Sequence, residues 1–321
     1  MTLDFRPLRD TDYDSLADLL NVAAIVDGRA QHVVGEELRE EFESMPVDLP
    51  VDTLAAWDGG RLVGVAYMMF LRSTVREERC YVLGTVHPDR RGNAIGRQLL
   101  EWGLERGTEL LQSSGNDLPK YLRVDTPRVN TSAIRLFEHF GLEPIRYFAD
   151  LRTDLSKPTP ARHAPTAGFR VVPWDLARSE EARHAKNAAF MDHWGSTPTP
   201  PEWWATQTSG FGSRPDWSYF AVDGDDKIIG HLITHRFEND DELLGAKYAW
   251  IDNIGTLAEW RGRGVASQLI ATALAKYREH GMQFAALDVD SANPTGAHRL
   301  YESLGFRVWR EFVHYQRVIR A

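Results

Sequence analysis

The pattern of apolar and polar positions changes period along the chain, and these changes mark its elements. Residues 250–256 mix β-branched and aromatic side chains without helical spacing, which predicts a strand. A glycine-rich break, Arg-Gly-Arg-Gly-Val-Ala, follows at residues 261–266. From Ser267 to Lys276 the apolar residues return at helical spacing. The predicted order is therefore strand, glycine turn and helix.

A glycine turn that opens a helix can hold an anion. Its first main-chain N–H groups lack acceptors, and the helix dipole adds positive potential there. Gly262 and Gly264 have no Cβ, so a phosphate can approach the main chain, and Arg261 and Arg263 add positive charge. The stretch is no P-loop, because no Gly-Lys-Ser/Thr follows, and GxGxxG is absent. By itself it predicts either a nucleotide site or a plain tight turn.

The same order of features occurs twice. Amphipathic stretches at residues 13–23 and 180–190 are each followed by an apparent hairpin, at residues 54–64 and 220–230. Equivalent positions lie 166, 170 and 164 residues apart, at Gly64 and Gly230, Arg91 and Arg261, and Gly141 and Gly305. Such similar offsets across separate features predict two domains of one kind in tandem.

The join between the two halves is rich in proline and small residues. Residues 156–167 lack apolar periodicity, as an extended connector would. We therefore expect an N-terminal domain at residues 1–155 and a C-terminal domain at residues 168–321. The order of elements in each half predicts an α/β fold, a mixed β-sheet flanked by helices on both faces.

Two motifs in the second half resemble the signatures of the GNAT superfamily of acyl-CoA-dependent N-acyltransferases. They are RGRGVA at residues 261–266 and N-x-x-x-A-x-x-L-Y-x-x-L-G-F from Asn293 to Phe306. The resemblance implies two GNAT folds in tandem, each with a splayed central sheet, and acetyl-CoA as acyl donor. The residues implied to bind the donor are Ile254, Gly255, Thr256, Arg261, Gly262, Arg263, Gly264, Val265, Ala266 and Asn293.

Acyl transfer to an amine requires a base, because an alkyl amine with a pKa of roughly 10 is mostly protonated near neutral pH. Asp252 lies on the strand that enters the glycine loop, where GNAT enzymes often carry an acid. An ordinary surface or capping carboxylate is an equal alternative at this position. Glu238 and Asp241, in the preceding loop, are reserve candidates.

The departing thiolate requires a proton donor, and the resemblance implies Tyr301 in that role. A core aromatic residue at helical spacing is the alternative. We favour function because the first half has Phe137 at the equivalent place, so packing alone does not require a hydroxyl. A main-chain N–H of residues 254–257 would meet the developing oxyanion. Asn293 would hold the donor's pantetheine amides or cap the following helix.

The first half lacks these groups when it is aligned on its loop arginine. Ala94 replaces Gly264 and Val82 replaces Asp252, and a Cβ at Ala94 would obstruct a phosphate. Gly92, Asn93 and Gly96 are retained, which leaves open a bound CoA or an unused pocket. We expect the N-terminal domain to be catalytically silent.

The acceptor site is predicted from residues 190–217, a segment dense in proline and aromatic side chains. This composition predicts a lid with flat apolar walls over the acceptor pocket, or equally a surface loop that buried tryptophans hold in place. The candidate acceptor-binding residues are Asp192, His193, Trp194, Trp203 and Trp204. The NAAF…W pattern and the tandem layout look most like the mycothiol synthase branch, which acetylates a glycosylated cysteine amine. An antibiotic or another small-molecule amine is as plausible an acceptor.

Composition excludes several other classes of protein. A net charge of −9 argues against nucleic acid as the main partner. One cysteine, Cys80, cannot form an internal disulfide, and no run approaches the roughly 18 apolar residues of a membrane span. We expect a cytoplasmic monomer or homodimer. His231 and His235 are four residues apart, but the glutamate of the zinc-protease motif is missing between them. Because the segment is a predicted strand, we expect both histidines to be exposed on its surface and to bind no metal.

Two other functions stay open from the sequence. The chain could be a non-catalytic acyl-CoA-binding or scaffolding protein, although Gly264, Asp252 and Tyr301 favour an enzyme. It could also acetylate protein lysines or N-termini, although the tryptophan-rich segment speaks against a wide peptide groove. The favoured hypothesis is an N-acetyltransferase whose C-terminal domain transfers acetyl from CoA to the primary amine of a small molecule, by direct attack of the amine on the thioester.

Overall fold

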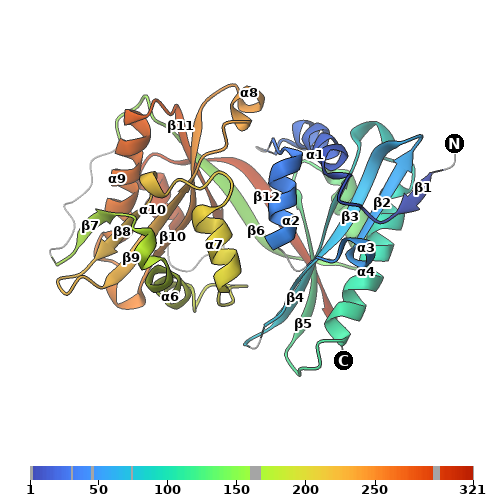
Figure 1. Cartoon of the computed structure of the whole chain (residues 1–321), viewed down its shortest axis with the longest axis horizontal. Coiled ribbons are helices and arrows are strands. Elements are labelled where there is room, and N and C mark those ends of the chain that lie inside the picture. Colours follow the sequence, from blue (N-terminus) through green and yellow to red (C-terminus); the bar gives the residue numbers. More distant parts are fainter. Residues whose placement is uncertain are drawn as a thin grey trace. The chain divides into compact units, whose positions relative to one another are not determined.

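The structure of the protein is a computed structural model. The structure describes residues 3–29, 32–44, 47–73, 75–159, 168–291 and 297–320. Contacts divide the chain into two compact units, whose elements are labelled in Figure 1. Unit 1 consists of Met1–Tyr147 with Arg310–Ala321, and unit 2 consists of Phe148–Trp309.

Unit 1 is built on a mixed sheet with the strand order β1-β2-β3-β4-β5-β12. Strands β4 and β5 are parallel, and the neighbouring pairs are antiparallel. Its elements are β1 (Asp4–Arg6), α1 (Tyr13–Asp27), α2 (Gly35–Ser44), α3 (Leu49–Asp52), β2 (Thr53–Asp58), β3 (Arg61–Leu71), β4 (Glu78–Val86), α4 (Ile95–Gln112), β5 (Lys120–Pro127), α5 (Thr131–His139) and most of β12 (Arg307–Ile319).

Unit 2 repeats this architecture with the strand order β6-β11-β10-β9-β8-β7. Strands β10 and β11 form its parallel pair. Its elements are most of β6 (Glu143–Asp154), β7 (Arg170–Pro173), α6 (Ser179–Ala189), α7 (Pro201–Ser209), β8 (Tyr219–Val222), β9 (Ile228–His235), α8 (Asp240–Leu244), β10 (Tyr248–Thr256), α9 (Val265–Glu279), β11 (Phe284–Asp290) and α10 (Ala297–Ser303).

The division by contacts differs from the linear division predicted above at two segments. Residues 148–154 of β6 pair with β11 in unit 2, and residues 312–319 of β12 pair with β5 in unit 1. Each half of the sequence thus supplies the last strand of the other unit's sheet. The pattern of a strand predicts its pleat and not the edge that it joins. Residues 160–167 of the predicted linker lie outside the described part of the chain.

Each sheet is covered by helices on both faces, which accounts for the apolar periodicity of the sequence. In unit 2, α9 buries Leu269, Ile270, Ala273, Leu274 and Tyr277 at helical spacing in one core, and α6 and α7 contribute to a second core. Unit 1 has the matching pair of cores, one under α4 and one under α1 and α2.

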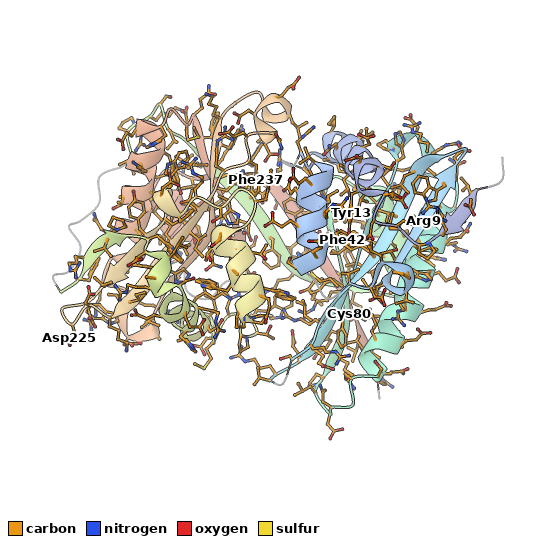
Figure 2. All side chains as sticks on the ribbon, viewed as in Figure 1. Arg9, Tyr13, Phe42, Cys80, Asp225 and Phe237 are labelled. Atoms are coloured by element: carbon orange, nitrogen blue, oxygen red, sulfur yellow. The ribbon has the colours of Figure 1, made fainter. Side chains whose placement is uncertain are left out.

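Cys80, labelled in Figure 2, lies in the α4 core of unit 1. Burial raises the pKa of its thiol to about 12. The thiol therefore stays protonated at neutral pH, and Cys80 serves as a packing residue of the core.

Candidate active site

The central strands of unit 2 separate halfway along their length. Residues Tyr248–Ile251 of β10 pair with Phe284–Leu287 of β11, and no further pairs form between these strands. Yet β10 continues to Thr256 against β9, and β11 continues to Asp290 against β6. The side of residues 253–256 that faces β11 therefore has main-chain groups without a sheet partner. The splayed sheet predicted from the resemblance is confirmed.

A β-bulge lies where the strands separate. Ile251 pairs with Thr234 and Asn253 with Ile233, so Asp252 is an extra residue in β10. Bulges redirect a side chain and recur next to active sites. Here the bulge places Asp252 beside α7, with its side chain 30% exposed.

One neighbour donates a hydrogen bond to the Asp252 carboxylate, and a second lies close to it. The Gln207 side-chain amide on α7 donates to Oδ2 at 2.6 Å, and His235 Nδ1 lies 3.5 Å from Oδ1. His235 Nε2 is 2.7 Å from the main-chain oxygen of Gln207. Because a carbonyl only accepts, Nε2 carries the hydrogen, and in the neutral ring Nδ1 has a lone pair and no hydrogen to donate. Asp252 is therefore oriented through Oδ2 by Gln207, and it is still reachable from solvent.

A buried lysine and a buried histidine lie on the same face. Lys186 on α6 is 8% exposed and donates to Thr199 Oγ1; burial lowers its pKa to about 8, against the opposing effect of Asp252. His231 is fully buried, and its Nε2 lies 2.7 Å from Asn253 Oδ1. Burial lowers the pKa of His231 to about 4, so it is neutral at pH 7. The prediction that His231 and His235 are exposed neighbours is wrong, because α6 and α7 cover this face of β9.

Asp288 and Tyr301 complete the group of polar side chains. Asp288 follows the last β11 residue paired with β10, and solvent reaches its side chain. Even so, surrounding protein atoms displace enough water to raise its pKa to about 6, and the charge of Asp252 adds to the shift. Tyr301 on α10 is 7% exposed, and burial, with the charge of Asp288, raises its pKa above the ordinary value. The three groups therefore share one electrostatic neighbourhood.

The glycine loop has the backbone of an anion seat. Gly262 and Gly264 have φ of +75° and +86°, and α9 begins at Val265. The first hydrogen bond of the helix runs from Gln268 N to Gly264 O at 3.0 Å, so the N–H groups of Val265 and Ala266 precede it and are not used by the helix.

The loop arginines have different surroundings. Arg261 donates to the main-chain oxygens of Ala189 and Thr256, at 2.8 and 3.3 Å, and so ties the loop to the end of α6. Arg263 stacks over Trp260 at 4.8 Å from the ring centroid and stays exposed. Its charge, rather than that of Arg261, is available to a ligand. Asn293 lies outside the described residues.

Residues 190–217 contain a helix, α7, that the sequence did not indicate. Trp204 on α7 is 2% exposed, and its Nε1 donates to Ser179 O at 2.9 Å, which favours the packing alternative for this residue. The Trp194 ring lies 6.4 Å from Phe148, and His193 packs on Phe190 at 5.5 Å. Asp192 is exposed and Trp203 is half-buried.

Glu238 and Asp241, the reserve candidates for the base, lie on α8 and the loop before it, and not on β10 with Asp252. Asp241 on α8 is ion-paired with Arg236, and Glu238 is exposed on the loop before it. Sequence reasoning did not single out Gln207, His235 as a partner of Asp252, Lys186 or Asp288. Only Asp288 carried a signal, since it is a charged residue within an otherwise apolar stretch, residues 284–289.

Unit 1 keeps the loop and loses the carboxylate. Gly92 and Ala94 have φ of +80° and +61°, so Ala94 adopts the left-handed conformation of Gly264 despite its Cβ. Strand β4 has no register shift, and its Val82 packs against Gly103 of α4. The residues that pair with Ile251 and Val82 occupy equivalent positions on β9 and β3, so Ile251 is the counterpart of Val82 and Asp252 has no counterpart. The predicted match of Val82 with Asp252 is therefore wrong, because counting back from the loop arginines does not detect an inserted residue.

Neither a membrane-spanning helix nor a metal-binding cluster occurs in the described part of the chain. No helix in the described ranges is long and apolar enough to cross a membrane. Across the same part of the chain, no three His, Cys, Asp or Glu side chains form a group able to hold a metal ion.

Known proteins resemble the chain over both units. The model of the acetyltransferase (GNAT) family matches residues 20–142 and 179–306. A mycothiol acetyltransferase from Thermobispora bispora is 31% identical over 272 residues, 82% of this chain and 83% of the relative. One from Streptomyces coelicolor is 30% identical over 301 residues, 91% of this chain and 87% of the relative.

Solved structures agree with the fold. A GCN5-related N-acetyltransferase from Sphaerobacter thermophilus has a TM-score of 0.76 and 25% identity, with 99% of this chain and 96% of that chain covered. A tandem GNAT protein from the clavulanic acid biosynthesis pathway has a TM-score of 0.73 and 18% identity, covering 100% and 99%, and shows the fold alone. The chain belongs to the acetyltransferase (GNAT) family, as a tandem, mycothiol synthase-like N-acetyltransferase.

Proposed function

We propose that unit 2 transfers acetyl from acetyl-CoA to the primary amine of a small molecule by direct attack. The observation that carries this proposal is the bulge that projects Asp252 where β10 leaves β11. This point lies on the strand that leads into the glycine loop, within the electrostatic reach of Asp288 and Tyr301. A carboxylate and a phenol are thus available near the point where β10 and β11 separate, where the donor would present its acyl group.

The donor would be held by main-chain groups. The N–H groups of Val265 and Ala266 suit a diphosphate, and Gly262 and Gly264 leave room for its approach. The unpaired main chain of residues 254–256 suits the amides of the pantetheine arm and the acyl oxygen. Bound acetyl-CoA supplies an activated acetyl thioester at this place.

Asp252 is proposed as the base that takes the amine proton. Its carboxylate accepts a hydrogen bond from Gln207, so the ordering is already present before an acceptor binds. Asp288, whose pKa of about 6 leaves it mostly ionised at pH 7.5, would attract the acceptor as an ammonium ion.

Tyr301 is proposed as the acid. Its raised pKa keeps the hydroxyl protonated at neutral pH, and no hydrogen-bond partner for it occurs among the described residues. The departing thiolate, whose conjugate thiol has a pKa of roughly 8.5, would accept a proton from Tyr301 as the thioester C–S bond breaks. The new amide C–N bond forms from the amine nitrogen. Of the two protons that the ammonium group loses, one passes to Asp252 and the other restores the phenol of Tyr301 through solvent.

The acceptor is proposed to be a small-molecule amine. Relatives named mycothiol acetyltransferase make the amine precursor of mycothiol the first acceptor to test. Unit 1 has no counterpart of Asp252, so we assign no step of this reaction to it.

Thiol release from acetyl-CoA tests the proposal on the full chain. We expect turnover with the mycothiol precursor or another small amine, and a loss of roughly a hundredfold for Tyr301→Phe. Tyr147→Phe, an exposed tyrosine of unit 1, is the matched control and should leave the rate unchanged. Acetyl-CoA binding without turnover on any amine would favour a non-catalytic acyl-CoA-binding or scaffolding protein. Turnover only on peptides would favour a protein N-acetyltransferase.

A further inference from the structure

Unit 1 contains a cavity of about 650 Å³. It reaches from the glycine loop, at Gly92 and Ala94, past the separated strands β4 and β5, to α1 and α2. This volume is within the usual range for small-molecule sites. Residues from seven helices and strands line it, so it is part of the fold of unit 1 rather than a surface irregularity.

The two ends of the cavity carry opposite charge. Arg97 and the main chain of the loop lie at one end. The Glu41 carboxylate, on α2, faces the other end with Tyr67 of β3. The cavity therefore suits an anionic group at the loop and a cationic group at α2.

Glu41 differs from the other carboxylates of the lining. Asp27 is ion-paired with Arg91 at 2.6 Å, and Asp125 is ion-paired with Arg29 at 3.0 Å. Among the described residues, the Glu41 carboxylate has neither a hydrogen bond nor an ion pair. A desolvated carboxylate without a partner is costly, and a ligand cation would offset that cost.

Tyr67 stands beside this carboxylate. Burial raises the pKa of Tyr67, and the charges of Glu41 and Asp125 raise it further, which places the phenol close to both. Phe42, labelled in Figure 2, lies 4.9 Å from the Tyr67 ring and fixes its position. The hydroxyl is therefore a protonated, pre-positioned hydrogen-bonding group at the cavity wall.

The position of Glu41 also matches that of a functional residue in unit 2. Glu41 is six residues after Gly35, which begins α2, and Gln207 is six residues after Pro201, which begins α7. Gln207 is the residue that contacts Asp252. Unit 1 thus has a carboxylate on its helix, at the place from which unit 2 reaches its strand carboxylate.

We propose that the α2 end of this cavity binds a small molecule that carries a protonated amine. The ammonium group pairs with Glu41 and lies within reach of the Tyr67 hydroxyl, and the apolar walls from Leu20, Val33 and Leu38 receive its hydrocarbon part. This inference concerns unit 1 and does not depend on the function proposed for unit 2.

Methionine methyl signals can report on each unit separately in the full chain. Met68 and Met69 directly follow Tyr67 on β3, whereas Met191 and Met282 belong to unit 2. Phenethylamine is the probe, and 2-phenylethanol is its neutral match. In [methyl-13C]methionine NMR we expect the amine, and not the alcohol, to shift Met68 and Met69 in a saturable manner.

Two variants of α2 decide the assignment. Glu41→Gln should weaken the amine response at Met68 and Met69 at least tenfold. Glu43→Gln, an exposed glutamate on the same helix, should leave it unchanged. The proposal is overturned if the amine shifts neither signal, or if Glu41→Gln responds like the unaltered chain. Shifts confined to Met191 and Met282 would overturn it too, and would leave the proposal for unit 2 standing.

Discussion

The two units differ most clearly in the strand that enters the glycine loop. Strand β4 of unit 1 pairs with β3 residue by residue, whereas β10 of unit 2 has one extra residue, Asp252, opposite β9. The loops themselves have the same backbone, with left-handed residues at equivalent places and a helix that begins immediately afterwards. One inserted residue therefore separates a strand that has a carboxylate at the splay from one that has none.

The comparison shows how this fold can place a different side chain at the splay without changing its architecture. A substitution at Val82 would place a carboxylate towards α4, where Gly103 leaves little space. The bulge instead adds a side chain on the face covered by α6 and α7, where Gln207 donates a hydrogen bond to it and His235 lies close by. In the cavity of unit 1, the carboxylate without an ion pair, Glu41, is on α2 rather than on the strand.

The largest expected effect is that of Asp252→Asn. Because asparagine cannot take the amine proton, we expect the turnover number to fall by roughly 10² to 10⁴ while acetyl-CoA binding is retained. Thiol release and calorimetric titration measure the two quantities. Asp225→Asn, on an exposed hairpin labelled in Figure 2, is the control. A rate within a factor of two of the unaltered chain across the pH range would assign the base elsewhere.

An intermediate effect concerns His231, whose counterpart in unit 1 is Val65. Its pKa of about 4 in the folded state lies below the unfolded value of roughly 6.5, so only the unfolded state is protonated between them. The free energy of unfolding should therefore fall as pH drops from 6.5 to 4, by about 3 kcal/mol at most.

Chemical denaturation at pH 7 and pH 4.5 measures this effect. His231→Gln keeps a donor for Asn253 and should flatten the pH dependence of unfolding. His184→Gln, an exposed histidine on α6, should leave the dependence as it is. An unchanged slope in His231→Gln would show that other groups cause the acid sensitivity of unit 2.

The smallest effect is expected in the loops. Ala94 has φ of +61°, a conformation that costs an L-residue about 1 kcal/mol, so Ala94→Gly should stabilise unit 1 by about that amount. Gly264→Ala should destabilise unit 2 similarly, since Gly264 has φ of +86°. Shifts of the thermal midpoints in opposite directions would support the shared loop geometry. Equal midpoints in all three chains would contradict it.

Much of the fold could be predicted from local pattern. The strand, glycine turn and helix appear at residues 248–256, 261–264 and 265–279, close to the predicted limits. The tandem layout and the splayed sheets were also predicted correctly. These features depend on residue spacing within one segment, which a sequence records directly.

The surroundings of the candidate active site were less predictable. Lys186 and Gln207 are brought beside Asp252 from α6 and α7, about 45 to 66 residues away in the chain. Helix α7 lies in the segment that was predicted to be a lid or a surface loop, because its tryptophans and prolines obscure the apolar period. Trp204 of this helix is a core residue. Nothing in local pattern specifies such long-range neighbours.

The sequence by itself determined the repeat, the glycine loops and the residue types available for chemistry, because each is a matter of order and spacing along one segment. Only the tertiary structure decided three further features: which sheet β6 and β12 complete, that Asp252 is a bulge with no counterpart in unit 1, and that Glu41 faces a cavity. All three depend on hydrogen-bond register or burial between distant segments, and these are settled only when the chain packs.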